Sequence, residues 1–343
     1  IILYVENTTP TFLAAGLLSR DYLIFPSGKT QIDVPGGNVL YAAVGHIIWD
    51  PDPPPGILAR VGEDYPEKWL DKFSARGLDM RGVKVLPYQV DIRSFMAFSD
   101  TRNFSREDPV SHFARAGSKF PKALLGYSPR KEDVDSRTKL QETSLRAEDI
   151  PPQYEDASTI HVCPIDYLTH SLFPALLRKS EFTAVTLDPS PGYMNPTYWG
   201  EVPSLLTGLT AFLPAEEEIR YLFQGRSDDL WEMAEGLAAY GCELIVIKRG
   251  ERGQLLYDAG SRTRWEIPSY PSNVVNPTGA GDAFCGGFMA GYRRTYEPLE
   301  AALYGNISAS VVVEGHLPEY ALDVLPGLPE LRLESIRESV RKV

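Results

Sequence analysis

Several features are scarce in this chain, and each scarcity excludes a class of protein. The 343 residues include only three cysteines, too few for a disulfide framework, so a reduced, cytoplasmic setting is predicted. No run of about 18 apolar residues occurs, so no membrane span is expected. Acidic residues outnumber basic ones and give a formal net charge of -12, which argues against nucleic-acid partners. No Gly-x-x-x-x-Gly-Lys-Ser/Thr sequence is present, which excludes a P-loop.

What the chain does contain is an alternation of short apolar runs with helical patterns. With 43% hydrophobic residues it can bury one large core, and we predict a single domain over residues 1–343. The apolar runs that indicate strands are residues 57–61, 159–163, 184–187, 210–213 and 244–247. This order predicts an α/β fold with a doubly wound, mostly parallel sheet and helices on both faces. In such sheets ligands bind beyond the carboxyl ends of the strands.

Three stretches depart from this alternation. Residues 20–35 and 83–100, with approximate limits, show the period of short strands, and we predict that they form a small antiparallel β lid over the main sheet. Residues 101–149 are polar and rich in Ser, Arg, Lys and Glu, which predicts a surface insertion.

The most informative segment is a glycine-rich turn that leads into a long apolar helix. An apolar pair at 274–275 predicts a strand before the turn, and Gly279-Ala280-Gly281-Asp282 follows. The turn would expose backbone N–H groups to an anion, and Asp282 could take a proton from a hydroxyl group. Two other interpretations remain open at this point. Glycines suit a strand-to-helix turn and aspartate suits a first helical turn for structural reasons alone. A dinucleotide fingerprint fits less well, because Phe284 stands where its third glycine belongs.

A second glycine pair lies near the N-terminus. Gly36-Gly37 precedes a helical pattern, so a small polar ligand could reach backbone N–H groups there, and Asp21 could accept hydrogen bonds from its hydroxyls. A plain turn and a capping aspartate explain the same residues. His161-Val-Cys163 is half of a metal site, and no second pair at ligand spacing completes it, so zinc is not predicted.

Six motifs, taken in order, resemble those of the ribokinase or PfkB family of carbohydrate and nucleoside kinases. They extend over most of the chain. The motifs are Gly16-Leu-Leu-Ser-Arg-Asp21, Gly36-Gly37, Val61-Gly62-Glu-Asp64, Asp188-Pro189-Ser-Pro191, Lys248-Arg-Gly250-Glu-Arg-Gly253 and Gly279-Ala-Gly281-Asp282.

The resemblance implies a ribokinase-like fold and transfer of the γ-phosphate of ATP, with Mg2+, to a hydroxyl of a small sugar, nucleoside or related alcohol. Asp282 would be the general base, and the anion hole would be Gly279, Ala280 and Gly281. The acceptor would be held by Asp21, Gly36, Gly37 and Tyr41. Residues along the nucleotide would be Lys248, Gly250, Gly253 and Asn306. Glu218 would order magnesium-bound water, although first-turn carboxylates at 216–218 are also favoured by the helix dipole alone.

Three departures from the family pattern accompany these matches. Asn276-Pro277 replaces an Asp-Thr pair, which predicts no potassium activation; Ala215 replaces an Asn; and Tyr41 replaces an Asn that commonly contacts a sugar. The pattern is similar to that of a fungal branch related to the yeast maintenance-of-killer protein. It leaves open the alternative of a catalytically reduced binding or interaction protein. By analogy, the lid also suggests a homodimer.

Overall fold

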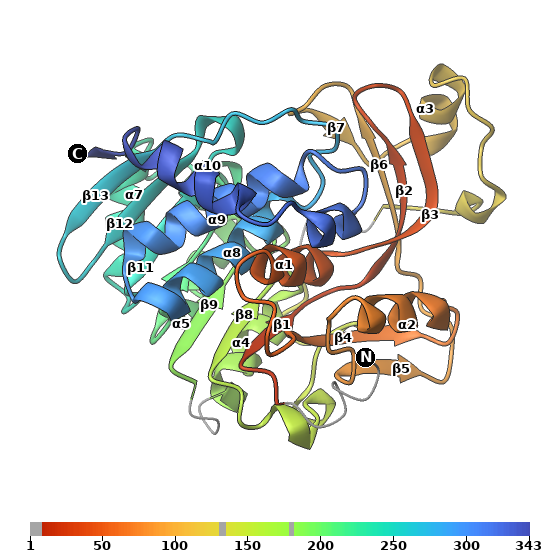
Figure 1. The fold of residues 1–343 in the computed structure, drawn as a ribbon. Coiled ribbons are helices and arrows are strands. Elements are labelled where there is room, and N and C mark those ends of the chain that lie inside the picture. The colour runs from red at the N-terminus through yellow and green to blue at the C-terminus, as the bar shows by residue number, and fades with distance from the viewer. Residues whose placement is uncertain (1–8, 130–134, 178–181) are drawn as a thin grey trace.

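The computed structural model describes residues 9–129, 135–177 and 182–343. They form a large sheet covered by helices, with a smaller sheet at one side (Figure 1). The large sheet has the strand order β14-β13-β12-β11-β10-β9-β8-β1-β4-β5. Neighbouring strands from β11 to β5 pair in parallel, whereas β12, β13 and β14 are added antiparallel. The predicted α/β fold with a mostly parallel sheet is confirmed.

The strands of the large sheet are short. In sheet order they are β14 (Arg341–Lys342), β13 (Thr263–Ile267), β12 (Gln254–Asp258), β11 (Leu244–Lys248), β10 (Ala211–Phe212), β9 (Ala184–Leu187), β8 (Thr159–Val162), β1 (Phe12–Ala15), β4 (Gly56–Gly62) and β5 (Val83–Leu86). Strand β1 illustrates why they are apolar throughout. Phe12 and Ala14 belong to the hydrophobic cluster on one face, and Leu13 and Ala15 to the cluster on the other. A strand buried on both faces has no polar side, so its sequence lacks alternation.

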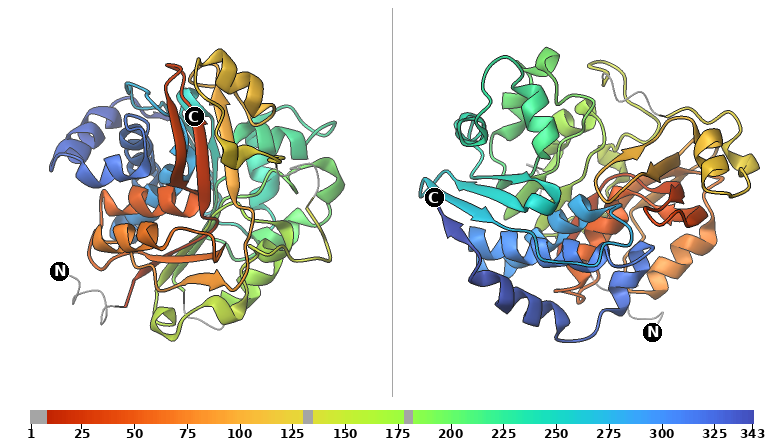
Figure 2. Two further views of the ribbon diagram at one scale, coloured as in Figure 1. Left: turned by 90° about the vertical axis from the view of Figure 1, so that its right-hand side faces the viewer. Right: turned by 90° about the horizontal axis from the view of Figure 1, so that it is seen from above.

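Helices cover both faces of this sheet (Figures 1 and 2). One face carries α1 (Asn38–Ile47), α2 (Glu67–Ala75), α8 (Ala280–Thr295), α9 (Pro298–Val312) and α10 (Leu328–Arg337). The opposite face carries α4 (Tyr167–Leu177), α5 (Val202–Leu206), α6 (Glu216–Leu222) and α7 (Leu230–Ala238). Short 3-10 turns join them: η3 (Ala147–Asp149), η4 (Pro152–Tyr154), η5 (Pro196–Tyr198), η6 (Gly250–Arg252) and η7 (Pro318–Asp323). Among the described residues, no helix has both the length and the apolar character needed to cross a bilayer.

The small sheet, which lies where a lid was predicted and is called the lid sheet below, has the strand order β3-β2-β6-β7. Its strands are β2 (Ser19–Ile24), β3 (Thr30–Gly36), β6 (Arg93–Phe98) and β7 (Phe104–Ser105). The prediction of strands over 20–35 agrees with β2 and β3. The prediction over 83–100 was wrong in its first part, because β5 pairs with β4 at the edge of the large sheet and only β6 reaches the lid. The lid is also mixed, since β2 and β6 are parallel.

The insertion predicted over residues 101–149 is only partly a surface segment. Helix α3 (Pro109–Arg115) and η2 (Lys122–Leu124) lie beside the lid sheet (Figure 1). Phe113 and Leu124 are buried there in one cluster with Tyr22 and Phe95 of the lid strands. Part of the insertion is therefore the hydrophobic cover of one lid face, which the polar composition of the segment did not reveal.

Candidate active site

The glycine turn begins α8. Gly279 is the N-cap residue with φ 76, a left-handed conformation that favours glycine. A Cβ on Gly279 would overlap the ring of Tyr41, so the turn tolerates no side chain at this position. No side chain caps the helix. The predicted anion hole therefore has the backbone geometry of an uncapped helix N-terminus, which suits a phosphate.

The strand predicted before this turn is wrong. Residues 274–275 form no strand; instead the carbonyl of Val313 accepts hydrogen bonds from the N–H groups of Val275 and Asn276, at 2.8 and 3.0 Å. The buried Asn276 amide accepts from the N–H of Thr278 at 3.0 Å and donates to the carbonyl of His316 at 2.9 Å. Direct protein hydrogen bonds on both sides of Asn276 thus fix the start of the turn.

Asp282 lies in the first turn of α8, two residues after the helix begins. Its pKa is raised to about 7, chiefly by burial and then by the negative charge of Asp188, while the positive charges of Lys248 and Arg106 act in the opposite direction. A carboxylate with a pKa near neutrality is suited to take a proton from a hydroxyl and to release it again.

Three of the four residues predicted to hold the acceptor, Asp21, Gly36 and Gly37, lie together at the junction of the lid sheet and α1. Ser19 donates a hydrogen bond of 2.5 Å to Asp21, and burial raises the pKa of Asp21 to about 6. A Cβ on Gly36 would overlap the Asp21 carboxylate, and one on Gly37, whose φ is 112, would overlap the carbonyl of Leu17. The glycines are therefore required for the lid strand to meet α1 closely.

Tyr41 connects the acceptor side to the glycine turn. Its side chain is 2% exposed, its ring lies on Gly279, and its hydroxyl has no hydrogen-bond partner among the described residues. Burial raises its pKa well above the ordinary value, with smaller contributions from Asp21 and Asp282. The aromatic ring therefore packs against the glycine turn, and a pocket reshaped by this residue stays a prediction.

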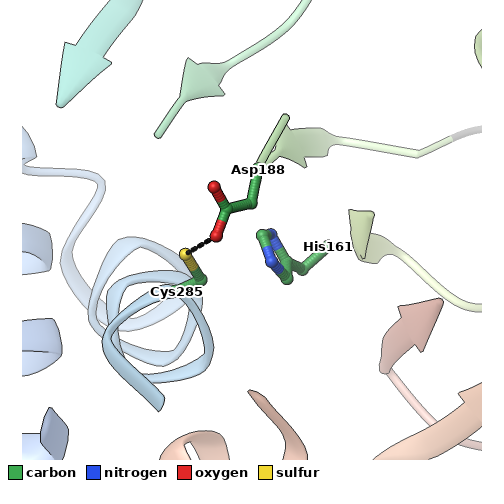
Figure 3. A group of neighbouring side chains, drawn as sticks. All are labelled: His161, Asp188 and Cys285. Carbon is green, nitrogen blue, oxygen red and sulfur yellow. Dashed lines mark hydrogen bonds between the residues drawn. The ribbon is translucent and has the colours of Figure 1, made fainter. Parts of the chain in front are cut away.

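Lys248 points into the protein rather than outward. Its ammonium forms an ion pair with Asp188, and the side chains of the pair are 13% and 4% exposed. Cys285 of α8 completes the group, with Sγ 3.7 Å from Lys248 Nζ and 3.5 Å from Asp188 Oδ2 (Figure 3). Burial opposes the charge on Lys248, but Asp188, Cys285 and Glu218 together outweigh it, and the pKa of Lys248 is raised.

His161 lies beside this pair, so His161, Asp188 and Cys285 bring three potential metal-ligand atoms within 4.8 Å of one another (Figure 3). The sequence had paired His161 with Cys163 instead. The ammonium of Lys248 already neutralises Asp188, and His161 Nδ1 is 2.9 Å from Thr186 Oγ1. These contacts suit a buried ion pair better than a metal centre.

Glu218, the predicted magnesium residue, lies in the first turn of α6. Its Oε2 accepts a hydrogen bond of 2.7 Å from the N–H of Ala215. Burial raises its pKa to about 8, with Asp188 adding to the shift and Lys248 opposing it. The charges of Asp188 and Lys248 act on the pKa of Glu218 and also on that of Asp282, so Glu218 and Asp282 belong to the same side of the site.

The other residues predicted along the nucleotide have mainly structural contacts. Gly250 lies in η6 and Gly253 ends it, both with positive φ, at the turn between β11 and β12. The Asn306 amide donates to Gln254 Oε1 at 2.8 Å and to the Pro268 carbonyl at 2.7 Å, and accepts from the N–H of Tyr270 at 2.9 Å. Through these hydrogen bonds, the side-chain amide of Asn306 holds the segment after β13 in place.

Arg106 is a residue of the site that the sequence did not suggest. It directly follows lid strand β7, and its positive charge lowers the pKa of both Asp21 and Asp282. Its guanidinium also lies 5.3 Å from the centre of the Phe104 ring. An arginine in a mixed-charge stretch has no distinguishing local pattern, so only the fold brings it to this place.

The family follows from a relative that matches most of the chain. A cytidine kinase from Thermococcus kodakarensis is 30% identical over 292 residues, which make up 83% of this chain and 89% of that protein. The chain belongs to the PfkB family of carbohydrate kinases. The model for the pfkB family carbohydrate kinases matches residues 158–323, a range that includes Lys248 and the glycine turn. This PfkB-family protein is therefore a kinase of the carbohydrate and nucleoside type.

Two further matches concern the fold and the fungal prediction. The crystal structure of an E. coli protein described as a ribokinase II, in complex with ATP and Mg2+, has a TM-score of 0.67 at 18% identity and covers 96% of this chain and 99% of that one. An uncharacterized protein from Schizosaccharomyces pombe is 23% identical over 335 residues, covering 89% of this PfkB-family chain and 84% of that protein. The ribokinase-like fold is confirmed, and membership of the fungal branch stays a prediction.

Proposed function

We propose that this protein transfers the γ-phosphate of ATP to a hydroxyl of a small nucleoside or sugar. The observation that carries the proposal is the arrangement at the start of α8. A partly buried carboxylate, Asp282, stands in the first turn after an uncapped left-handed glycine, Gly279, and burial raises its pKa to about 7. An anion-binding backbone next to a proton acceptor is what in-line phosphoryl transfer requires.

Each group would have a defined part in the transfer. The N–H groups of the turn from Gly279 to Gly281 would hold the terminal phosphate, and Asp282 would take the proton of the attacking hydroxyl. Asp21 would accept a hydrogen bond from another hydroxyl of the acceptor and so orient it. ATP bound with Mg2+ supplies the phosphoryl group and part of the charge compensation. Glu218, raised in pKa by burial, fits a carboxyl that loses its proton when a cation approaches.

A nucleoside is the first acceptor to test, because a cytidine kinase is 30% identical to this chain over 83% of its length. The Asp21 carboxylate can accept a hydrogen bond from a ribose hydroxyl, and the Tyr41 hydroxyl can donate one. The Tyr41 ring, which lies on Gly279, narrows the space for the acceptor beside these two groups. We expect ATP consumption with cytidine or a related nucleoside to exceed that with hexoses. The assay is an ADP-release screen over nucleosides, sugars and vitamin-like alcohols. An absence of release with every acceptor, together with melting curves that do not move with millimolar MgATP, would favour the alternative of a binding or interaction protein.

The pH dependence follows from the same carboxyl. Only the deprotonated form of Asp282 accepts a proton, so kcat/KM should fall as the pH drops below about 7, the value to which burial raises its pKa. The measurement is kcat/KM for the acceptor between pH 5 and 9 at saturating MgATP, with the ionic strength held constant. A rate that is flat down to pH 5 would mean that the essential base has the pKa of an ordinary carboxylate.

A further inference from the structure

We propose that the buried Lys248–Asp188 pair is a positioning element for phosphoryl transfer. The pair holds an ammonium behind the glycine turn and sets the charge around Asp282, and Lys248 makes no direct contact with the nucleotide. The proposal rests on the proposed function. It replaces the nucleotide-binding role that the sequence predicted for Lys248.

The position of the lysine side chain carries the first step. Lys248 is the last residue of β11, and Asp188 directly follows β9, so both lie at the carboxyl edge of the sheet, on either side of β10. A Cβ built on Gly281 would lie 3.5, 3.9 and 4.0 Å from Nζ, Cε and Cδ of Lys248. The end of the lysine side chain therefore lies on the side of Gly281 toward which a Cβ would point, at ordinary van der Waals distance from that position.

The contacts of the ammonium carry the second step. Asp188 binds it, and Cys285, one helical turn after Gly281, lies 3.7 Å from Nζ. If Lys248 moved away from Asp188 to bind a phosphate, it would leave a buried, unpaired carboxylate. Because such a charge is strongly unfavourable, the pair stays together and acts on the phosphate through the turn.

The charges that face Asp282 carry the third step. They come from several elements: Asp188 after β9, Lys248 in β11, Arg106 after the lid strand β7, Tyr41 in α1, Cys163 after β8 and Cys285 in α8. After burial, the charge of Asp188 is the largest influence and favours the protonated form of Asp282, whereas Lys248 and Arg106 favour the ionised form. The pair thus keeps Asp282 basic enough to accept a proton while placing a positive charge near the incoming phosphate.

The test is the variant Asp188→Asn, with Asp149→Asn as the matched control. Asp149 forms a buried ion pair with Arg60, with side-chain exposures of 2% and 6%, away from α8. We expect Asp188→Asn to move the acid limb of the kcat/KM profile to lower pH by about one unit, because a like charge near Asp282 is removed. kcat should fall, and KM for ATP should stay within about threefold. Asp149→Asn should lower the melting temperature and leave the acid limb where it is.

A second variant keeps the test valid if the single change impairs folding. Asp188→Asn combined with Lys248→Met leaves no unpaired buried charge, and the acid limb should still lie below the wild-type one, because Asp188 is the stronger of the two charges. An acid limb that stays in place in both variants overturns the proposal, as does a rise in KM for ATP that exceeds the fall in kcat. If wild type transfers phosphate to no acceptor, the proposed function fails. The titration of Asp282, followed by NMR of 13C-labelled aspartate and assigned with Asp282→Asn, then tests the pair independently.

Discussion

Replacing Gly279 with alanine is expected to abolish phosphoryl transfer and to destabilise the fold. The residue has φ 76, where a non-glycine residue costs about 1–2 kcal/mol. The added Cβ would overlap the Tyr41 ring, and overpacking a buried site costs about 1–3 kcal/mol more. We expect the free energy of unfolding to fall by about 2–5 kcal/mol. Any folded fraction should lose activity by a factor of about 100 or more, because the N–H groups at the turn are displaced.

Two glycine variants separate the causes of this effect. Gly225 has φ 75 and open space around its Cβ position, so Gly225→Ala should show the backbone cost without loss of activity. Gly281→Ala meets only the Lys248 side chain, at 3.5 Å, so it should fold nearly as well as wild type. Chemical denaturation measures the free energy of unfolding, and the ADP-release assay measures the activity. An active and fully stable Gly279→Ala protein would disprove the close contact between α1 and α8.

The second large effect is expected for Asp282→Asn. The amide has the shape of the carboxyl but accepts no proton, so kcat should fall by a factor of about 100 to 10,000. ATP binding should change little, because the turn that receives the phosphate is backbone. The measurement combines steady-state kinetics with the shift of the melting temperature by MgATP. The control is Asp229→Asn, which alters a carboxylate at the start of α7 that accepts from Trp231 and Glu232 N–H groups. Its activity should stay at the wild-type level, whereas a fully active Asp282→Asn protein would remove Asp282 from the role of base.

Local motifs explain what the sequence could predict. A side chain would overlap Asp21 at position 36, Leu17 at position 37 and Tyr41 at position 279. Only glycine fits these positions, so glycines at a helix start can be recognised in the sequence. The helix after each turn has an apolar pattern of its own. The positions of the glycine turns and of Asp282 at the start of α8 were therefore predictable, as was the alternation of strands and helices.

What the sequence could not predict depends on distant partners. The apolar pair at 274–275 has the composition of a strand, but no strand among the described residues pairs with it, and the Val313 carbonyl accepts hydrogen bonds from the N–H groups of Val275 and Asn276. β5 has the alternation of a lid strand, yet its partner is β4. Lys248 ends a strand, as many surface lysines do, and its partner Asp188, 60 residues away, is what turns it inward. Composition and spacing carry no information on such pairings.

The most direct measurement of the central claim is 31P NMR of the protein with MgATP and the most active acceptor from the screen. If Asp282 and the glycine turn transfer the terminal phosphate to a hydroxyl, the γ-phosphate signal should decline while equal amounts of ADP and a new phosphomonoester appear, and Asp282→Asn should suppress both products. The appearance of inorganic phosphate in place of the phosphomonoester, or equal product with the variant, would contradict the account.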